Sequence, residues 1–73
     1  MNIERYNRFI DDNGRLFIVL GINSHKVEEK WQNKSIDLLN VNAEKVNEVN
    51  LPDFENYINK KLLTKVSHNK PKP

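Results

Sequence analysis

The most apolar stretch of the chain runs from Leu16 to Ile22, and it is entered through the polar segment Asp11-Asp12-Asn13-Gly14. Asn-Gly between two apolar segments is a strong hairpin signal, because both residues tolerate the positive φ of a type I′ turn. Residues 4–10 mix aromatic and β-branched side chains with polar ones, as a strand with one wet face does. We therefore expect an antiparallel hairpin made of strands at 4–10 and 15–22.

The second of these strands is apolar on both faces. Its even-numbered positions from Leu16 to Ile22 share one face, and Phe17 and Val19 lie on the other together with Gly21. Such a strand is expected at the centre of the sheet, covered on two sides. On this basis Leu20→Ala should cost about 2–5 kcal/mol, and Gly21 should mark a bulge or a sharp bend.

The segment 23–34 has only two large apolar residues, Val27 and Trp31. Their spacing permits a single helical turn capped by Ser24, and it equally places both residues on one face of an extended arm. We favour a long polar excursion or hairpin arm for this segment.

Strand composition returns at 35–41, followed by a turn at 42–45 and a short polar strand at 46–51 that suits a sheet edge. A helix is predicted at 52–62, because Pro52 is preorganised for a first helical turn and apolar residues recur at helical spacing. That apolar stripe consists of Phe54, Tyr57, Ile58 and Leu62. A last strand is predicted at 63–66, and residues 67–73 are expected to form a disordered basic tail.

These elements predict an α+β, mainly β fold: a small bent antiparallel sheet or an SH3-like partial barrel, capped by one C-terminal helix. At 73 residues there is room for one modest core, so we expect a single domain at 1–66. The chain has no cysteine, which excludes disulfides and thiolate metal sites. Because it also lacks a signal-peptide pattern and any apolar run long enough to span a bilayer, we expect a cytoplasmic protein with no membrane partner.

The sequence offers no convincing catalytic, cofactor or metal site. Asp11 to Gly14 resembles the start of a calcium loop, but the twelfth position holds Ile22 instead of glutamate, so a turn is preferred. His25 lies in a polar segment and His68 in the expected tail, with no cysteine to join them. We predict neither enzymatic activity nor a cofactor.

Trp31 is the main candidate for protein binding, since tryptophan is enriched among interface hot spots. Val27, Glu28 and Glu29 would accompany it on the same segment. The alternative is that Trp31 closes the end of the core with Val27, and in a domain this small that alternative is preferred.

The net charge of +2 is distributed unevenly along the chain. Residues 1–59 hold seven basic and ten acidic side chains, a net charge of −3, whereas residues 60–73 hold five lysines and no acid, a net charge of +5. These lysines could contact a phosphate backbone, although a solvated tail, with two of the lysines complementing a helix C-terminus, is the simpler interpretation. The nucleic-acid candidates are Lys60, Lys61, Lys65, Lys70 and Lys72.

The segments Phe9 to Ile22 and Phe54 to Leu63 resemble the small N-terminal β-domain of transposon-encoded DDE-type transposases. The resemblance covers about 25 positions and implies an apolar hairpin, further strands, a terminal helix and a polar exit. It implies no catalytic residue, because the acidic triad of that family has no counterpart here. The expected function is a non-enzymatic interaction module of a mobile genetic element or phage that binds a protein partner. The alternative is a nucleic-acid-binding accessory domain that uses the lysine-rich end.

Overall fold

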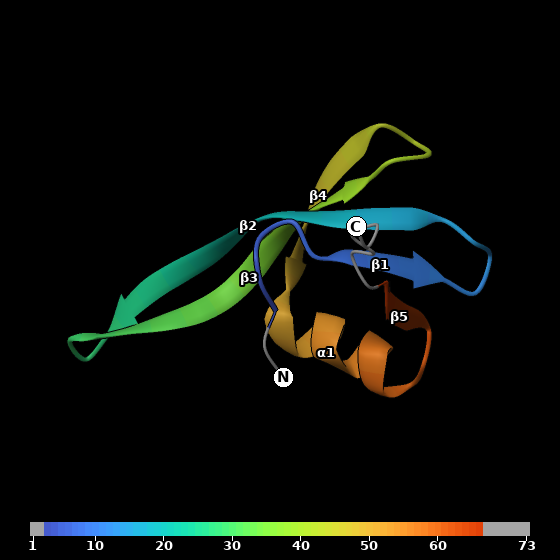
Figure 1. Ribbon diagram of the computed structural model, residues 1–73. Helices are drawn as coiled ribbons and strands as arrows, with labels where there is room; N and C mark the ends of the chain where they lie inside the picture. The colour runs from blue at the N-terminus through green and yellow to red at the C-terminus, as the bar shows by residue number, and fades with distance from the viewer. Residues whose placement is uncertain (1–2, 67–73) are drawn as a thin grey trace, which may run out of the picture.

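The structure, a computed structural model, describes residues 3–66 and contains five strands and one helix (Figure 1). The strands form one antiparallel sheet in the order β4-β3-β2-β1-β5. Within the described residues, both the predicted mainly β class and the single C-terminal helix are confirmed. The elements are β1 (Arg8–Asp11), β2 (Leu16–Val27), β3 (Lys30–Asn40), β4 (Lys45–Asn50), α1 (Leu51–Asn59) and β5 (Leu63–Val66).

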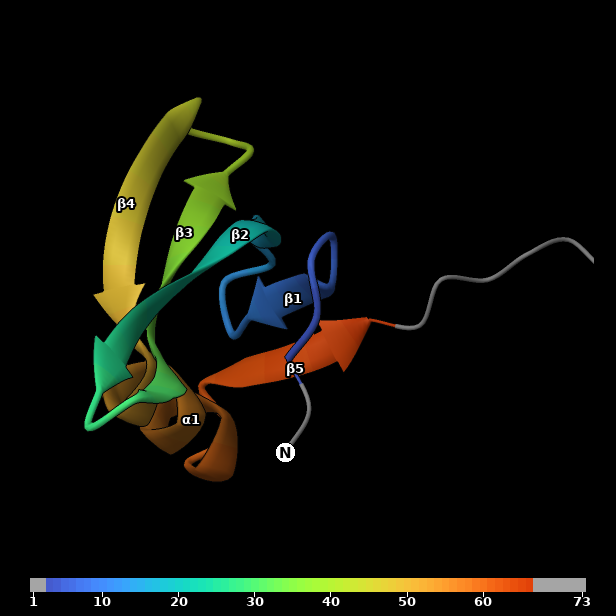
Figure 2. The ribbon, with the colours of Figure 1, turned by 90° about the vertical axis from the view of Figure 1, so that its left-hand side faces the viewer.

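The core lies between one face of the bent sheet and α1, which covers that face from below in Figure 1. Phe54 of α1 is fully buried, and its ring meets that of Phe9 edge to face, with centroids 4.9 Å apart. Figure 2 shows β5 returning from α1 to lie beside β1. The buried apolar residues are Phe9, Val19, Ile36, Leu38, Phe54 and Leu63.

A β-bulge interrupts β2 at the predicted place. Val19 pairs with Leu38 and Gly21 pairs with Asp37, which leaves Leu20 as the extra residue. The extra residue shifts the alternation, so Val19 and Ile22 both face α1. Leu20 is half-buried and does not belong to the core cluster.

The prediction that β2 is covered on both faces is wrong. Within residues 3–66 the only helix packs on one face of the sheet, and that sheet has no second sheet above it. Ile18 and Leu39 stay half-exposed on the opposite face, and Val46 is 54% exposed. The register aligns these side chains in one row across β2, β3 and β4.

The β1–β2 hairpin is confirmed, but its turn differs from the type I′ turn predicted. The Gly14 N–H donates to the Asp11 carbonyl at 3.1 Å, and within this loop only Gly14 has a positive φ, of 80°. This pattern is a type I turn followed by a left-handed glycine, the common three-residue hairpin loop. The first strand also begins later than predicted, at Arg8, because residues 4–7 form a turn of their own.

The helix ends at Asn59, three residues before the predicted end. The Leu62 N–H donates to the Tyr57 carbonyl and the Lys61 N–H to the Ile58 carbonyl, the two hydrogen bonds of a Schellman motif. Lys61 occupies the left-handed position at φ 62°, where glycine is usual. Leu62 therefore follows the helix and does not extend its apolar stripe, and Tyr57 is 44% exposed.

The edge strand β4 and the last strand β5 agree with the predictions to within one residue. The predicted third strand extends toward the N-terminus as far as Lys30, which pairs with Val27. The predicted disordered tail at 67–73 lies outside the described residues.

Candidate functional site

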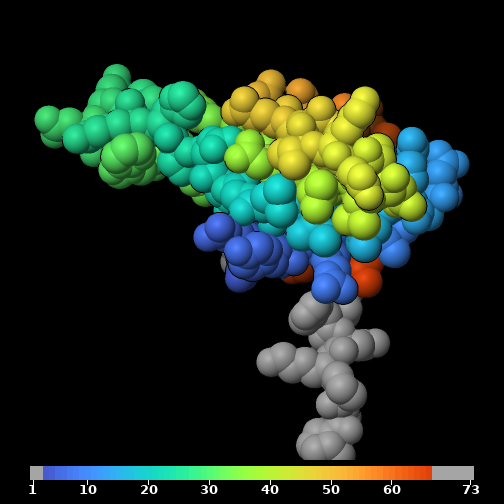
Figure 3. Space-filling model, turned by 90° about the horizontal axis from the view of Figure 1, so that it is seen from above, coloured from blue at the N-terminus to red at the C-terminus, as the bar shows by residue number. Residues whose placement is uncertain are grey.

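The second half of β2 and the first half of β3 form a two-stranded arm that projects from the core. We define the arm as residues 24–33, which pair continuously from Ser24↔Asn33 to Val27↔Lys30. Every residue of the arm is exposed. Figure 1 shows the arm projecting to the lower left, and Figure 3 shows it beyond the edge of the domain. The prediction of a hairpin arm is therefore correct.

The tip of the arm is a two-residue turn made of two glutamates. Glu28 and Glu29 have φ values of 49° and 65°, the two positive φ angles of a type I′ turn. Asn-Gly is the preferred sequence at these positions, and each non-glycine residue held there costs about 1 kcal/mol. The turn thus places two carboxylates side by side at the tip, at some cost in local stability.

Trp31 lies on one face of the arm opposite Lys26, and 71% of its surface is exposed. The preferred interpretation, that Trp31 closes the core with Val27, is therefore wrong. Val27 is itself 39% exposed, and within residues 3–66 Trp31 is the most exposed large apolar side chain. All four predicted protein-binding residues, Trp31, Val27, Glu28 and Glu29, lie on the arm. The expectation that Val27 and Trp31 share one face is wrong, because Val27 pairs with Lys30 and Lys26 pairs with Trp31, which places Val27 on the opposite face.

Polar side chains at the base of the arm connect β2, β3 and β4. Asn23 Nδ2 lies 3.1 Å from both Ser35 Oγ and Asp37 Oδ1, and the Ser35 hydroxyl donates to Glu48 Oε2. Ser35 is only 4% exposed although it lies on the face away from the helix. Leaving the buried Ser35 hydroxyl without a hydrogen-bond partner would cost free energy, so this network holds β2, β3 and β4 together at the base of the arm.

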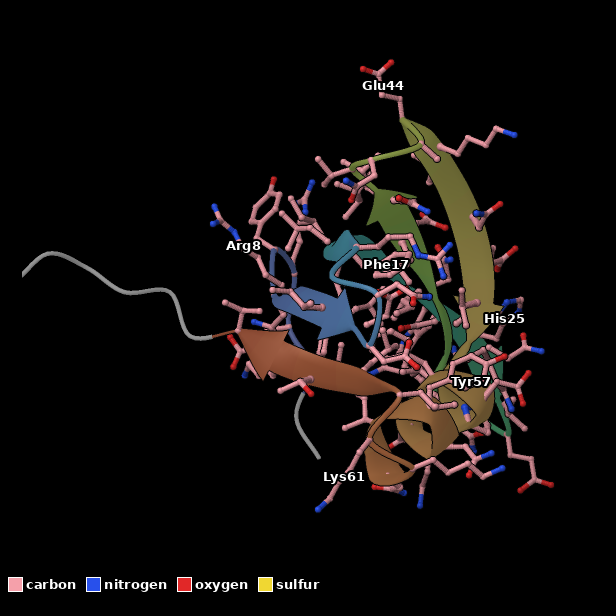
Figure 4. All side chains as sticks on the ribbon, turned by 90° about the vertical axis from the view of Figure 1, so that its right-hand side faces the viewer. Arg8, Phe17, His25, Glu44, Tyr57 and Lys61 are labelled. Carbon is pink, nitrogen blue, oxygen red and sulfur yellow. The ribbon has the colours of Figure 1, made fainter. Side chains whose placement is uncertain are left out.

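An apolar groove of about 350 Å³ opens between the sheet and the C-terminal end of α1. Phe17 and Leu38 line it from the sheet, and Tyr57 and Leu62 line it from the helix and the Schellman turn. Figure 4 shows Phe17 and Tyr57 on the sheet and helix sides of this region. No single sequence pattern predicts this groove, because its walls come from distant segments.

The rim of the groove carries the ion pair between Arg15 and Asp11, with 2.7 Å between Arg15 Nε and Asp11 Oδ2. Partial desolvation of Asp11 raises the pKa of its carboxyl. Hydrogen bonds from the backbone and side chain of Arg15, and from the backbone of Asn13, outweigh that effect and lower the pKa below its usual value of 3.8. The carboxylate of Asp11 therefore belongs to the turn and is not a candidate proton donor near neutral pH.

The predicted nucleic-acid lysines occupy separate positions in the structure. Lys60 is the C-cap residue of α1, Lys61 holds the left-handed position after it, and Lys65 lies on β5 in register with Phe9. All three are exposed. Lys70 and Lys72 lie outside the described residues.

Three further findings concern metal ligands, the two histidines and membrane-spanning helices. Among residues 3–66 no three histidine, cysteine, aspartate or glutamate side chains gather where they could hold a metal ion. His25 is exposed on the arm opposite Gln32, and His68 falls outside the described residues. Over the same range no helix is long and apolar enough to cross a membrane.

Comparison with protein-family models, with curated proteins and with solved structures found no match.

Proposed function

We propose that this chain is a non-enzymatic protein-binding module whose contact element is the arm. The observation that carries the proposal is the 71% exposure of Trp31 on a two-stranded ribbon that buries nothing of its own. An exposed tryptophan costs solubility and adds nothing to this core, whereas a tryptophan that becomes buried in a partner is a frequent hot spot. The surface of the arm is thus better explained by binding than by folding.

The chemistry around Trp31 indicates the kind of partner. Lys26 lies across from it, Lys30 precedes it, and the tip adds the carboxylates of Glu28 and Glu29. An apolar anchor surrounded by charges of both signs fits the usual interface plan of a dry centre and a polar rim. The partner surface should offer an apolar pocket bordered by both acidic and basic side chains.

We further propose that the sheet is a partial barrel of the SH3-like kind and that the chain comes from a mobile genetic element or phage. The strand order, a meander from β1 to β4 with β5 returned to the β1 edge, supports a partial barrel of the SH3-like kind. The resemblance of the hairpin and helix to a transposase N-terminal domain supports a source in a mobile genetic element or phage, and a cytoplasmic location goes with that source.

The test is quantitative affinity capture from host cells on immobilised protein. Trp31→Ala should weaken capture of the partner roughly 30-fold, which corresponds to a hot spot of about 2 kcal/mol. Gln32→Ala is the matched control, because Gln32 is the neighbouring exposed residue of the same strand on the opposite face of the arm.

Equal capture by wild type and Trp31→Ala would contradict the proposal. Loss of the folded state in Trp31→Ala, seen in a thermal melt, would also contradict it, because that result would place Trp31 in the core.

A further inference from the structure

The N-terminal segment folds into a tight turn against β2 that the sequence pattern did not predict. The Asn7 N–H donates to the Glu4 carbonyl at 3.1 Å, closing a four-residue turn with Arg5 and Tyr6 at its centre. Val19 anchors this turn, since its N–H donates to Asn7 and its carbonyl accepts from Tyr6. Figure 3 shows this segment beside β2, and Ile3 before it packs against the core.

Tyr6 occupies a backbone conformation that tyrosine disfavours. Its φ is 70°, and Arg5 before it does not share the positive angle. A positive φ at the second central residue alone defines a type II turn, where glycine or asparagine is preferred. A bulky residue at this position costs on the order of 1–2 kcal/mol, and such strain is concentrated at functional sites.

The strained turn displays a tyrosine ring and an ordered guanidinium. Tyr6 is 62% exposed, and Arg5 Cζ lies 5.0 Å from the centroid of the ring. Arg5 Nε also donates to the Leu20 carbonyl at 3.0 Å, at the bulge of β2. One hydrogen bond and one aromatic face thus hold Arg5, while its terminal amino groups remain available.

Arg8 completes a positively charged hollow. Arg5, Tyr6, Asn7, Arg8 and Ile18 line a space of about 510 Å³. Figure 4 shows Arg8 extending away from the helix side. In the described part of the chain the one ion pair joins Arg15 and Asp11, so neither Arg5 nor Arg8 is neutralised by a carboxylate. The acidic residues closest to this hollow in sequence are Glu4 and Asp11, and Asp37 is the closest one across the β2–β3 register.

We infer that this hollow binds single-stranded nucleic acid, with a base stacked on Tyr6 and the flanking phosphates held by Arg5 and Arg8. An exposed ring beside two guanidinium groups that no carboxylate of residues 3–66 neutralises matches a ligand that repeats a flat base and an anionic phosphodiester. The row of Ile18, Leu39 and Val46 continues as apolar surface across the sheet from this point, where a following base can lie. The site is separate from the arm and from the lysines at the end of α1.

The test is a fluorescence-anisotropy titration of an oligothymidylate of about 15 nucleotides at about 50 mM salt. Tyr6→Gly should weaken binding roughly tenfold while the melting temperature stays equal or rises, because glycine relieves the backbone strain. Tyr6→Phe keeps the ring and should bind like wild type.

Variants that remove one positive charge distinguish binding in this hollow from non-specific attraction of nucleic acid to basic residues elsewhere. Two phosphate contacts predict a slope of about −1.4 for log K against log salt, and Arg8→Gln should reduce its magnitude by about 0.7. Lys45→Gln removes the same charge from the far edge strand β4 and should leave the slope unchanged.

Three kinds of result would overturn the inference. The first is absence of binding at low salt or equal binding by Tyr6→Gly and wild type. The second is equal affinity for a duplex, whose bases cannot stack on Tyr6, or displacement by inorganic phosphate at matched ionic strength. The third is loss of binding in a Lys60→Gln, Lys61→Gln double variant with Arg8→Gln unaffected, which would assign the contact to the lysine-rich end.

Discussion

The same two strands, β2 and β3, behave differently on the two sides of a second register shift, between Asn23 and Ser24 at the base of the arm. On one side Val19 and Leu38 face each other in the core, together with the fully buried Ile36 near the base of the arm. On the other side Lys26 and Trp31 face each other in solvent. Backbone pairing continues through both halves, so hydrogen bonds alone do not distinguish them. The difference lies in what the side chains bury, which assigns stability to the first half and recognition to the second.

The largest effect should come from removing the helix anchor of the core. Phe54→Ala deletes a fully buried ring that contacts Phe9, and such changes cost about 3–5 kcal/mol. A domain of this size has about that much stability in total, so the variant should be largely unfolded by circular dichroism. A cooperative melt close to that of wild type would show that the contact of α1 with the sheet does not hold the fold together.

A smaller effect separates two neighbouring residues of β2. Val19→Ala should lower the free energy of unfolding by about 2 kcal/mol, because Val19 is fully buried. Leu20→Ala should cost only about 1 kcal/mol, less than the 2–5 kcal/mol expected from the sequence, because Leu20 is the half-buried extra residue of the bulge. Urea denaturation of both variants checks the order, and a larger loss for Leu20→Ala would contradict the bulge.

The smallest effect on global stability should come from the tip of the arm. Replacing Glu28-Glu29 with Asn-Gly relieves two positive φ angles. Because the tip lies outside the core, the urea midpoint should hardly move. Hydrogen exchange of the arm amides should nevertheless slow about fivefold, the equivalent of about 1 kcal/mol in local opening. A rise in global stability of that size would show that the arm and the core unfold as one unit.

Much of the fold could be predicted because its signals are local. The hairpin at Asp11 to Gly14, the bulge beside Gly21 and the helix start near Pro52 each depend on residues with distinctive backbone preferences. The errors fall where the chain uses ordinary residues at positive φ: Tyr6, the turn at Glu28 and Glu29, and Lys61 at the end of the helix. No glycine or asparagine marks these positions, so the N-terminal turn, the arm tip and the helix end gave no signal.

The candidate site was predictable only in part. Val27 and Trp31 were identified as candidates, but their spacing fits a helical turn, an extended arm or the end of the core equally well. Which of these applies depends on whether another strand or helix packs against Val27 and Trp31. The hydrophobic pattern of the sequence does not contain that information. The groove was missed because distant segments form its walls. The Arg5–Tyr6–Arg8 hollow was missed because residues 4–10 were expected to form a strand, and nothing in the sequence marks the positive φ of Tyr6.

Quenching of Trp31 fluorescence by acrylamide tests the central claim most directly, because Trp31 is the only tryptophan in the chain. If the arm projects into solvent, the quenching constant of the folded protein should be close to that of the urea-unfolded chain, and the emission maximum should shift little on unfolding. A folded protein with protected, blue-shifted emission that becomes accessible only in urea would contradict the account, because Trp31 would then belong to the core.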